Sequence, residues 1–271
     1  MKLKLRVYVL LTTVFLSLGS GHLMASRARL SAQRAYQSQG PMIRVLLEKG
    51  ANAALLEAKG EYAVINKENG KLLSTGTTGK RFVVHSLEGG LKWGEEYPDV
   101  FQIAVIPRNP KTMLYVNGMQ YKGAVSVYRA REGRILVVNE LPIEDYLKSV
   151  LSLQLEAPLT KEAGAAIAIA ARTEAFAITR ERDPKKLWDV VASEVNYFGH
   201  AVTMQKDLAI EPAVNETKFM VLESTQEGKP LRLVSIVPQK AQEFADRGFD
   251  AKKILQNSYP HSKLSVTSTT R

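Results

Sequence analysis

Between Met42 and Val138, short apolar runs rich in β-branched residues alternate with turn-forming residues. Seven runs show this pattern, namely MIRVLLE, EYAVIN, RFVVHS, VFQIAVIP, MLYVNG, AVSVYRA and RILVVN. Turn signals such as Asn69-Gly70 and Asn117-Gly118 lie between them. Short runs separated by such signals are typical of strands joined by hairpins. The pattern therefore predicts a mostly antiparallel β region in this half of the chain.

After Asn139 the spacing of the apolar residues becomes helical. A helix is predicted from Pro142 to Leu151, with one apolar face made of Ile143, Tyr146, Leu147 and Val150. A longer helix is predicted from near Thr160, its N-cap, to about Arg182. Its central sequence, AGAAIAIAARTEAFAI, is rich in small residues on several faces, so neighbouring elements can approach it closely. We expect this helix to be buried.

Two further segments complete the predicted fold. Residues 210–224 have the pattern of a strand or a short helix, and residues 239–256 have that of a final amphipathic helix. We predict an α+β fold, in which a β-rich N-terminal half of antiparallel strands is followed by a helix-rich half.

Composition narrows the chemistry more than the fold. The chain has 271 residues, 45% of them apolar and 24% charged, which suits a globular protein of one large or two modest domains. It has no cysteine, which excludes disulfides, thiolate nucleophiles and cysteine-bound zinc or iron–sulfur clusters. The histidines show no metal-ligand spacing. We therefore expect no metal and no cofactor.

The first 25 residues have the order of an export signal. Lys2, Lys4 and Arg6 precede an apolar stretch from Val7 to Leu18, and the small residues 19–21 follow. The apolar stretch is short for a membrane span, although an uncleaved signal anchor stays an alternative. We predict export to the periplasm, the cell wall or the outer face of the inner membrane, with possible membrane anchoring through this segment. Residues 26–40 are predicted to be a basic tether.

Predicted export changes both the net charge of the protein and the partners that this charge favours. The whole chain carries a formal charge of +10, and removal of residues 1–25 takes away three cations and no anions, which leaves +7. A basic exported protein meets anionic walls, glycans and membrane surfaces rather than nucleic acid. We expect no nucleic-acid partner, since no recognised nucleic-acid motif is present either.

A run of motifs between Tyr121 and Ala177 resembles a known family. In order, the motifs are Tyr121-Lys122-Gly123, Val137-Val138-Asn139, Leu141-Pro142, Glu144-Asp145-Tyr146-Leu147 and Ala170-Ala171-Arg172-Thr173. Their identity and spacing resemble the stage II sporulation protein D family, also known for its amidase-enhancer (LytB-like) domain. Weaker similarity follows at Ser193-Glu194-Val195, at Val221-Leu222 and between Gln239 and Pro260. The resemblance covers most of the chain after the predicted signal.

This resemblance implies a domain organisation and a role. A β-rich region at residues 41–120 would precede a SpoIID/LytB-like domain at 121–264 and a tail at 265–271. Family members are exported cell-wall proteins that act on peptidoglycan glycan strands, and active members are lytic transglycosylases. A family segment with an "HS--GG-T" signature is missing near residues 228–235, so the domain is shortened there.

The family's proposed catalytic glutamate is the main departure. By ungapped counting from Asp145 to Arg172, its position is occupied by Gln154. A glutamine cannot supply a general acid's proton, and loss of such an acid costs about 10²–10⁴ in rate. Glu156 lies two residues further on and would reach the same place only if the loop were reshaped. Glu156 and Gln154 are thus the candidate catalytic positions, and a solvent-facing Glu156 is the alternative.

Three residues are candidates for contact with the glycan. Arg172 is expensive to bury alone, so it either points into a glycan groove or pairs with a carboxylate such as Asp145 or Glu144. Tyr146 lies on an amphipathic face and is either a substrate contact or a core residue. Asn139 could position a sugar or act as a turn or cap residue.

Two functional hypotheses follow, and the sequence leaves open whether the protein is an enzyme. In the first, it is an exported cell-wall protein that cuts muramyl glycosidic bonds without water. In the second, it is a catalytically degenerate glycan-binding module that assists an N-acetylmuramoyl-alanine amidase in septal remodelling. Both hypotheses share peptidoglycan glycan strands as the partner.

Overall fold

The computed structural model describes residues 40–154, 159–200, 210–232 and 235–267. The predicted export segment and nearly all of the predicted tether lie outside these residues. The described residues, which begin at Gly40, belong to one compact unit. None of the helices in these ranges is long and apolar enough to cross a membrane.

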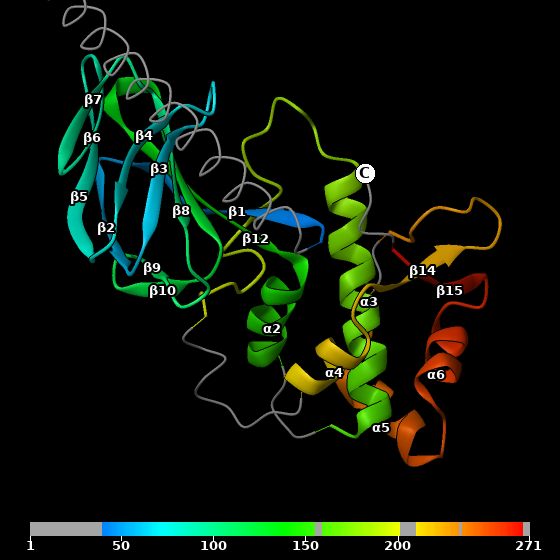
Figure 1. Cartoon of the computed structure of the whole chain (residues 1–271). Helices are drawn as coiled ribbons and strands as arrows, with labels where there is room; N and C mark the ends of the chain where they lie inside the picture. Colours follow the sequence, from blue (N-terminus) through cyan, green and yellow to red (C-terminus); the bar gives the residue numbers. More distant parts are fainter. Residues whose placement is uncertain (1–39, 155–158, 201–209, 233–234, 268–271) are drawn as a thin grey trace, which may run out of the picture. The chain divides into compact units, whose positions relative to one another are not determined.

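The larger sheet has seven strands and joins distant parts of the chain (Figure 1). In spatial order the strands are β13 (Val190–Val191), β1 (Met42–Ala51), β12 (Ile135–Pro142), β11 (Ala124–Arg129), β8 (Gln102–Pro107), β3 (Tyr62–Asn66) and β4 (Leu72–Gly76). All neighbours pair antiparallel except β1 and β13. The long β1–β12 ladder crosses the predicted boundary at residue 120.

The second sheet covers the first and supplies the other half of a buried core. Its strands are β10 (Met119–Tyr121), β9 (Met113–Val116), β2 (Ala53–Lys59), β5 (Lys80–Leu87), β6 (Gly90–Trp93) and β7 (Glu95–Pro98). Trp93 of this sheet is fully buried, donates a hydrogen bond from Nε1 to the Leu56 carbonyl at 2.9 Å and meets Tyr62 edge-on at 5.4 Å. Apolar residues from both sheets belong to one cluster.

Five helices and a two-stranded sheet follow in the remaining described segments. They are α2 (Ile143–Gln154), α3 (Lys161–Arg180), α4 (Ile210–Glu216), β14 (Met220–Ser224), α5 (Pro238–Asp246), α6 (Ala251–Ser258) and β15 (Ser262–Val266). The α2 helix begins directly where β12 ends, and the Ile143 amide donates to the Pro41 carbonyl at 2.9 Å. The large sheet therefore fixes the position at which the helical part starts.

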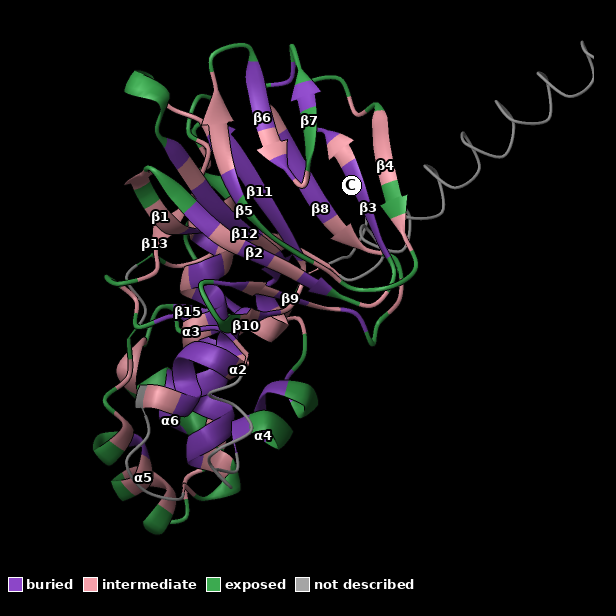
Figure 2. Cartoon of the chain, turned by 90° about the vertical axis from the view of Figure 1, so that its left-hand side faces the viewer, coloured by how far each residue is buried: buried purple, intermediate pink, exposed green. Residues whose placement is uncertain are grey.

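The α3 helix is the centre of this part and contacts α2, α4, α5, α6 and β14. Its first turn is capped by Thr160, whose side chain accepts a hydrogen bond from the Ala163 amide. Twelve of its residues are buried, most of them alanines, and Figure 2 shows burial along its length. Small side chains permit this close approach from several directions, as the sequence predicts.

The structure confirms an α+β fold and corrects its second half. The seven predicted β runs correspond to β1, β3, β5, β8, β9, β11 and β12. A helix-rich second half is an overstatement, because the end of β12 and the strands β13, β14 and β15 lie after Asn139. Residues 210–224 contain both a helix and a strand. The single helix predicted over 239–256 is two helices, because Gly248 between them has φ +81°, outside the helical range.

Candidate functional site

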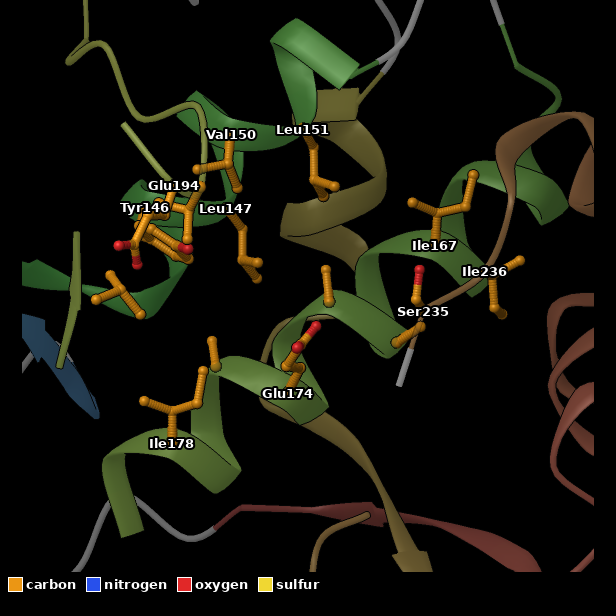
Figure 3. A pocket seen from close by; sticks show the side chains of 15 residues that line it. Tyr146, Leu147, Val150, Leu151, Ile167, Glu174, Ile178, Glu194, Ser235 and Ile236 are labelled. Carbon is orange, nitrogen blue, oxygen red and sulfur yellow. The ribbon is translucent and has the colours of Figure 1, made fainter. Parts of the chain in front are cut away.

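A pocket of about 250 Å³ lies between α2 and α3 (Figure 3). The face of α3 that lines it consists of Ile167, Ala170, Ala171, Glu174, Ala175 and Ile178. The α2 helix contributes Tyr146, Leu147, Val150 and Leu151, and the remaining lining comes from Val190, Glu194, Val195, Ser235 and Ile236. Most of the lining residues are thus apolar, with a few polar groups among them, which is the usual make-up of a small-molecule site.

Glu174 is the acidic group that α3 presents to this pocket. Ala170, Ala171 and Ile178 lie within four residues of it along the same helix face. Its side chain is half-buried, and Figure 3 shows it projecting from α3 into the pocket. Burial raises the pKa of the Glu174 carboxyl above its ordinary value of 4.5. The carboxyl is therefore shifted toward its protonated form, the form in which a general acid acts.

Tyr146 brings an aromatic ring to the same pocket. The pKa of its hydroxyl is raised by burial and, secondarily, by the charge of Glu174, so the hydroxyl remains a donor at neutral pH. The Tyr146 ring packs against that of Tyr197 with centroids 5.8 Å apart. Tyr146 is a core residue, 7% exposed and part of the buried apolar cluster, and it is also among the residues that line the pocket.

Asn139 lies behind this aromatic pair rather than in the pocket lining. It is completely buried within β12, so it is not a turn or cap residue. Its Oδ1 accepts a 2.6 Å hydrogen bond from the Tyr197 hydroxyl. Its Nδ2 donates to the carbonyls of Lys122 and Ala124, both at 2.9 Å. Asn139 therefore holds Tyr197 in place beneath Tyr146.

Arg172 is buried on another face of α3. Its Nε and Nη2 each donate a 2.8 Å hydrogen bond to the Glu144 carboxylate. The remaining guanidinium donors reach Thr217 Oγ1 at 3.2 Å and main-chain carbonyls, including that of Val214 at 3.0 Å. Between the two sequence alternatives, the structure shows the ion pair with Glu144. Arg172 is not among the residues that line the described pocket.

The predicted catalytic positions fall at the edge of the described structure. Gln154 is the last residue of α2, and Glu156 lies outside the described residues. The two pocket carboxyl groups, Glu174 and Glu194, are missing from the sequence-based candidates. A usable signal for Glu174 exists, because it is an acidic residue in the middle of a helix otherwise rich in alanine.

Comparison with known proteins identifies the family. The model of the Stage II sporulation protein (SpoIID) family matches residues 131–223, which contain α2, α3 and α4. The chain belongs to the SpoIID family. An uncharacterized protein of Chlamydia muridarum (strain MoPn / Nigg) is 38% identical over 83% of this chain and 78% of its own length. Another from Chlamydia pneumoniae is 38% identical over 81% of this chain and 79% of its own length.

A more distant relative is also uncharacterized, and solved structures provide no further match. An uncharacterized protein of Brachyspira hyodysenteriae (strain ATCC 49526 / WA1) is 27% identical over 66% of this chain, and the match spans 48% of that protein. No solved structure matches the chain significantly. The SpoIID family domain indicates a cell-wall-related role.

The SpoIID-like motifs of this chain are joined to one another by buried polar contacts. The Arg172–Glu144 ion pair connects the motif in α3 with the motif at the start of α2. The Thr173 hydroxyl accepts a 2.9 Å hydrogen bond from the Leu222 amide of β14, and Tyr197 donates to Asn139 of β12. Residues that are far apart in sequence are thus held around α3. The motif residues therefore have a structural role, since their contacts hold distant segments of the chain together.

Proposed function

We propose that this protein is exported and cuts peptidoglycan glycan strands as a lytic transglycosylase. The SpoIID family domain supports a cell-wall-related role. The resemblance also implies the activity, because active members of the family are lytic transglycosylases. The observation that carries the proposal is the pocket between α2 and α3, which a half-buried carboxyl group and an aromatic side chain both line. The signal-like order of residues 1–25 and the basic charge of the remaining chain suit a protein that works against an anionic wall.

The chemistry of lytic cleavage matches the polar groups available in the pocket. One carboxyl group protonates the glycosidic oxygen and then, ionised, accepts the proton of the muramyl 6-hydroxyl as that hydroxyl attacks the anomeric carbon. No water enters, so the two-carboxylate arrangement of ordinary glycosidases is not required. An acid for this step needs a raised pKa, and Glu174 has one because it is partly buried.

The size of the pocket sets how much substrate it can take. Its volume of about 250 Å³ lies just below the range of about 300–1,000 Å³ typical of small-molecule sites. We infer that it accepts about one sugar ring, while neighbouring rings of the strand lie outside it. The Tyr146 side chain borders this space, where its ring is largely buried in the core and its hydroxyl is a potential donor to such a sugar.

A second candidate function is glycan binding without cleavage. Gln154 at the position of the family's catalytic glutamate favours it, because glutamine can hydrogen-bond a sugar but cannot protonate a leaving group. In that case the protein would hold glycan strands and assist an N-acetylmuramoyl-alanine amidase. The two functions share location and ligand and differ in the products they leave.

Product analysis separates the two functions. Purified protein lacking residues 1–25 is incubated with intact and with peptide-stripped glycan, and the products are read by mass spectrometry. Lytic transglycosylation predicts 1,6-anhydromuramyl ends, which are one water lighter than the reducing ends left by hydrolysis. Reducing ends would contradict the transglycosylase proposal. Uncut glycan that is retained on immobilised protein would support the binding module instead.

A further inference from the structure

The departure at Gln154 raises the question of which group protonates the leaving oxygen in this chain. The family position cannot do so, because a neutral amide has no proton of suitable acidity. A replacement has to be a carboxyl group that reaches a cavity able to hold a sugar. Within the described residues, the pocket between α2 and α3 contains two such groups, Glu174 and Glu194.

The two carboxyl groups have different surroundings. Glu194 is exposed to solvent, whereas Glu174 is half-buried between the apolar faces of α2 and α3. Glu174 also comes from the middle of a 20-residue helix that other elements surround, so its backbone is firmly placed. Burial is the cause of the raised pKa of Glu174, with no offsetting cation or hydrogen-bond donor among the described residues.

We propose that Glu174 is the general acid of this chain and replaces the family glutamate whose position holds Gln154. This inference rests on the proposed lytic function. The Glu174 proton passes to the glycosidic oxygen as the bond from that oxygen to muramyl C1 breaks, and the bonding electron pair stays on the oxygen. The muramyl 6-hydroxyl oxygen then bonds to C1, and its proton returns to Glu174. The carboxyl ends as it began, and no water is consumed.

The position of Glu174 also explains how Tyr146 takes part. Tyr146 lines the pocket from α2 and Glu174 lines it from α3, and the charge of Glu174 adds to the effect of burial in raising the pKa of the Tyr146 hydroxyl. A sugar bound there meets the Tyr146 side chain from α2 and the Glu174 carboxyl from α3. Tyr146 thereby binds the substrate, while Glu174 transfers the proton.

The test compares four proteins in the anhydromuramyl assay. They are the wild type, Glu174→Gln, Glu156→Gln and the control Glu243→Gln, which makes the same chemical change at an exposed residue of α5. Glu174→Gln is expected to lower the rate by about 10²–10⁴, to retain glycan binding and to be at least as stable as the wild type. Glu243→Gln is expected to cut at the wild-type rate, and Glu156→Gln tests the other candidate acid directly.

The pH profile provides an independent readout. The wild-type rate should fall as the pH rises through the raised pKa of Glu174, and any residual rate of Glu174→Gln should lack this limb. Glu174→Gln that cuts at the wild-type rate would overturn this inference alone, as would loss of cutting in Glu156→Gln with Glu174→Gln active. An inactive wild type would overturn the proposed function and this inference with it.

Discussion

Two charged side chains in the middle of α3 meet opposite environments. Arg172 and Glu174 are two residues apart and therefore point about 200° away from each other around the helix. The Arg172 side chain is 3% exposed and makes two hydrogen bonds with the Glu144 carboxylate. Glu174 lines the pocket instead, and no cation contributes to its shifted pKa.

The difference separates a structural charge from a functional candidate. A buried ion pair whose remaining donors are also satisfied fixes one arrangement of its neighbours, here α2, α4 and the start of β14. A half-buried carboxyl without a partner cation costs stability, and such groups are concentrated at active sites. One helix therefore carries its anchoring charge and its candidate reactive charge on different faces.

The largest expected effect comes from removing Arg172, whose ion pair with Glu144 anchors α3 to its neighbours. Arg172→Met should lower the free energy of unfolding by about 3–5 kcal/mol, because Glu144, whose side chain is 13% exposed, would lose its partner. Urea denaturation monitored by circular dichroism measures this loss. The double variant Arg172→Met/Glu144→Leu should recover part of it, since an apolar pair carries no unpaired charge. A loss below about 1 kcal/mol in Arg172→Met would show that the ion pair does not anchor α3.

A packing substitution tests the same asymmetry without changing charge. A Cβ at Gly164 would lie 3.2 Å from the Ala213 Cβ of α4, which is a tight contact, so a larger side chain there would have to displace α4. Gly164→Val should cost about 1–3 kcal/mol through overpacking.

Ala171→Val provides the matched control for this packing test. It places the same side chain on the pocket-lining face and should cost less than about 1 kcal/mol in urea denaturation. Equal losses in the two variants would mean that the faces of α3 do not differ in packing.

The sequence predicts α3 well but not the roles of its charged residues. Thr160 as N-cap and the small-residue core follow from local patterns, and both are present in the structure. For Arg172, the sequence shows only that the charge needs a partner or a groove, since the choice depends on the distant Glu144. Glu174 is overlooked because a pocket is formed by α2, α3 and later segments together, which helical periodicity along one element does not reveal.

The β region also contains elements that local sequence patterns do not predict. The segment AALLEAK forms β2, although alanine, leucine, glutamate and lysine favour helices. It becomes a strand because it pairs with β5 on one side and β9 on the other. Very short strands such as β13 likewise depend on a neighbouring ladder rather than on their own residues. Tertiary pairing, which a single sequence does not display, decides these elements.

The smallest expected effect concerns the stability contribution of Glu174. Its folded-state pKa is raised by burial above the ordinary 4.5, so the folded protein keeps the proton over a pH range in which the unfolded chain has lost it. The stability gained from this proton is complete below the unfolded pKa and is lost as the pH rises through the folded pKa. Glu174→Gln removes the titration, so it should gain stability relative to the wild type as the pH rises from about 4 to 7.

Denaturation midpoints of both proteins at pH 4 and pH 7 measure this change, and other titrating groups cancel in the difference. Glu243→Gln should show no comparable pH dependence, because that side chain is exposed. A Glu174→Gln difference that is flat, or that falls as the pH rises, would contradict a desolvated carboxyl in the pocket. In that case the ionised Glu174 carboxyl, like the paired Arg172, would not lower the stability of the fold. The contrast between an anchoring face and a reactive face of α3 would then disappear.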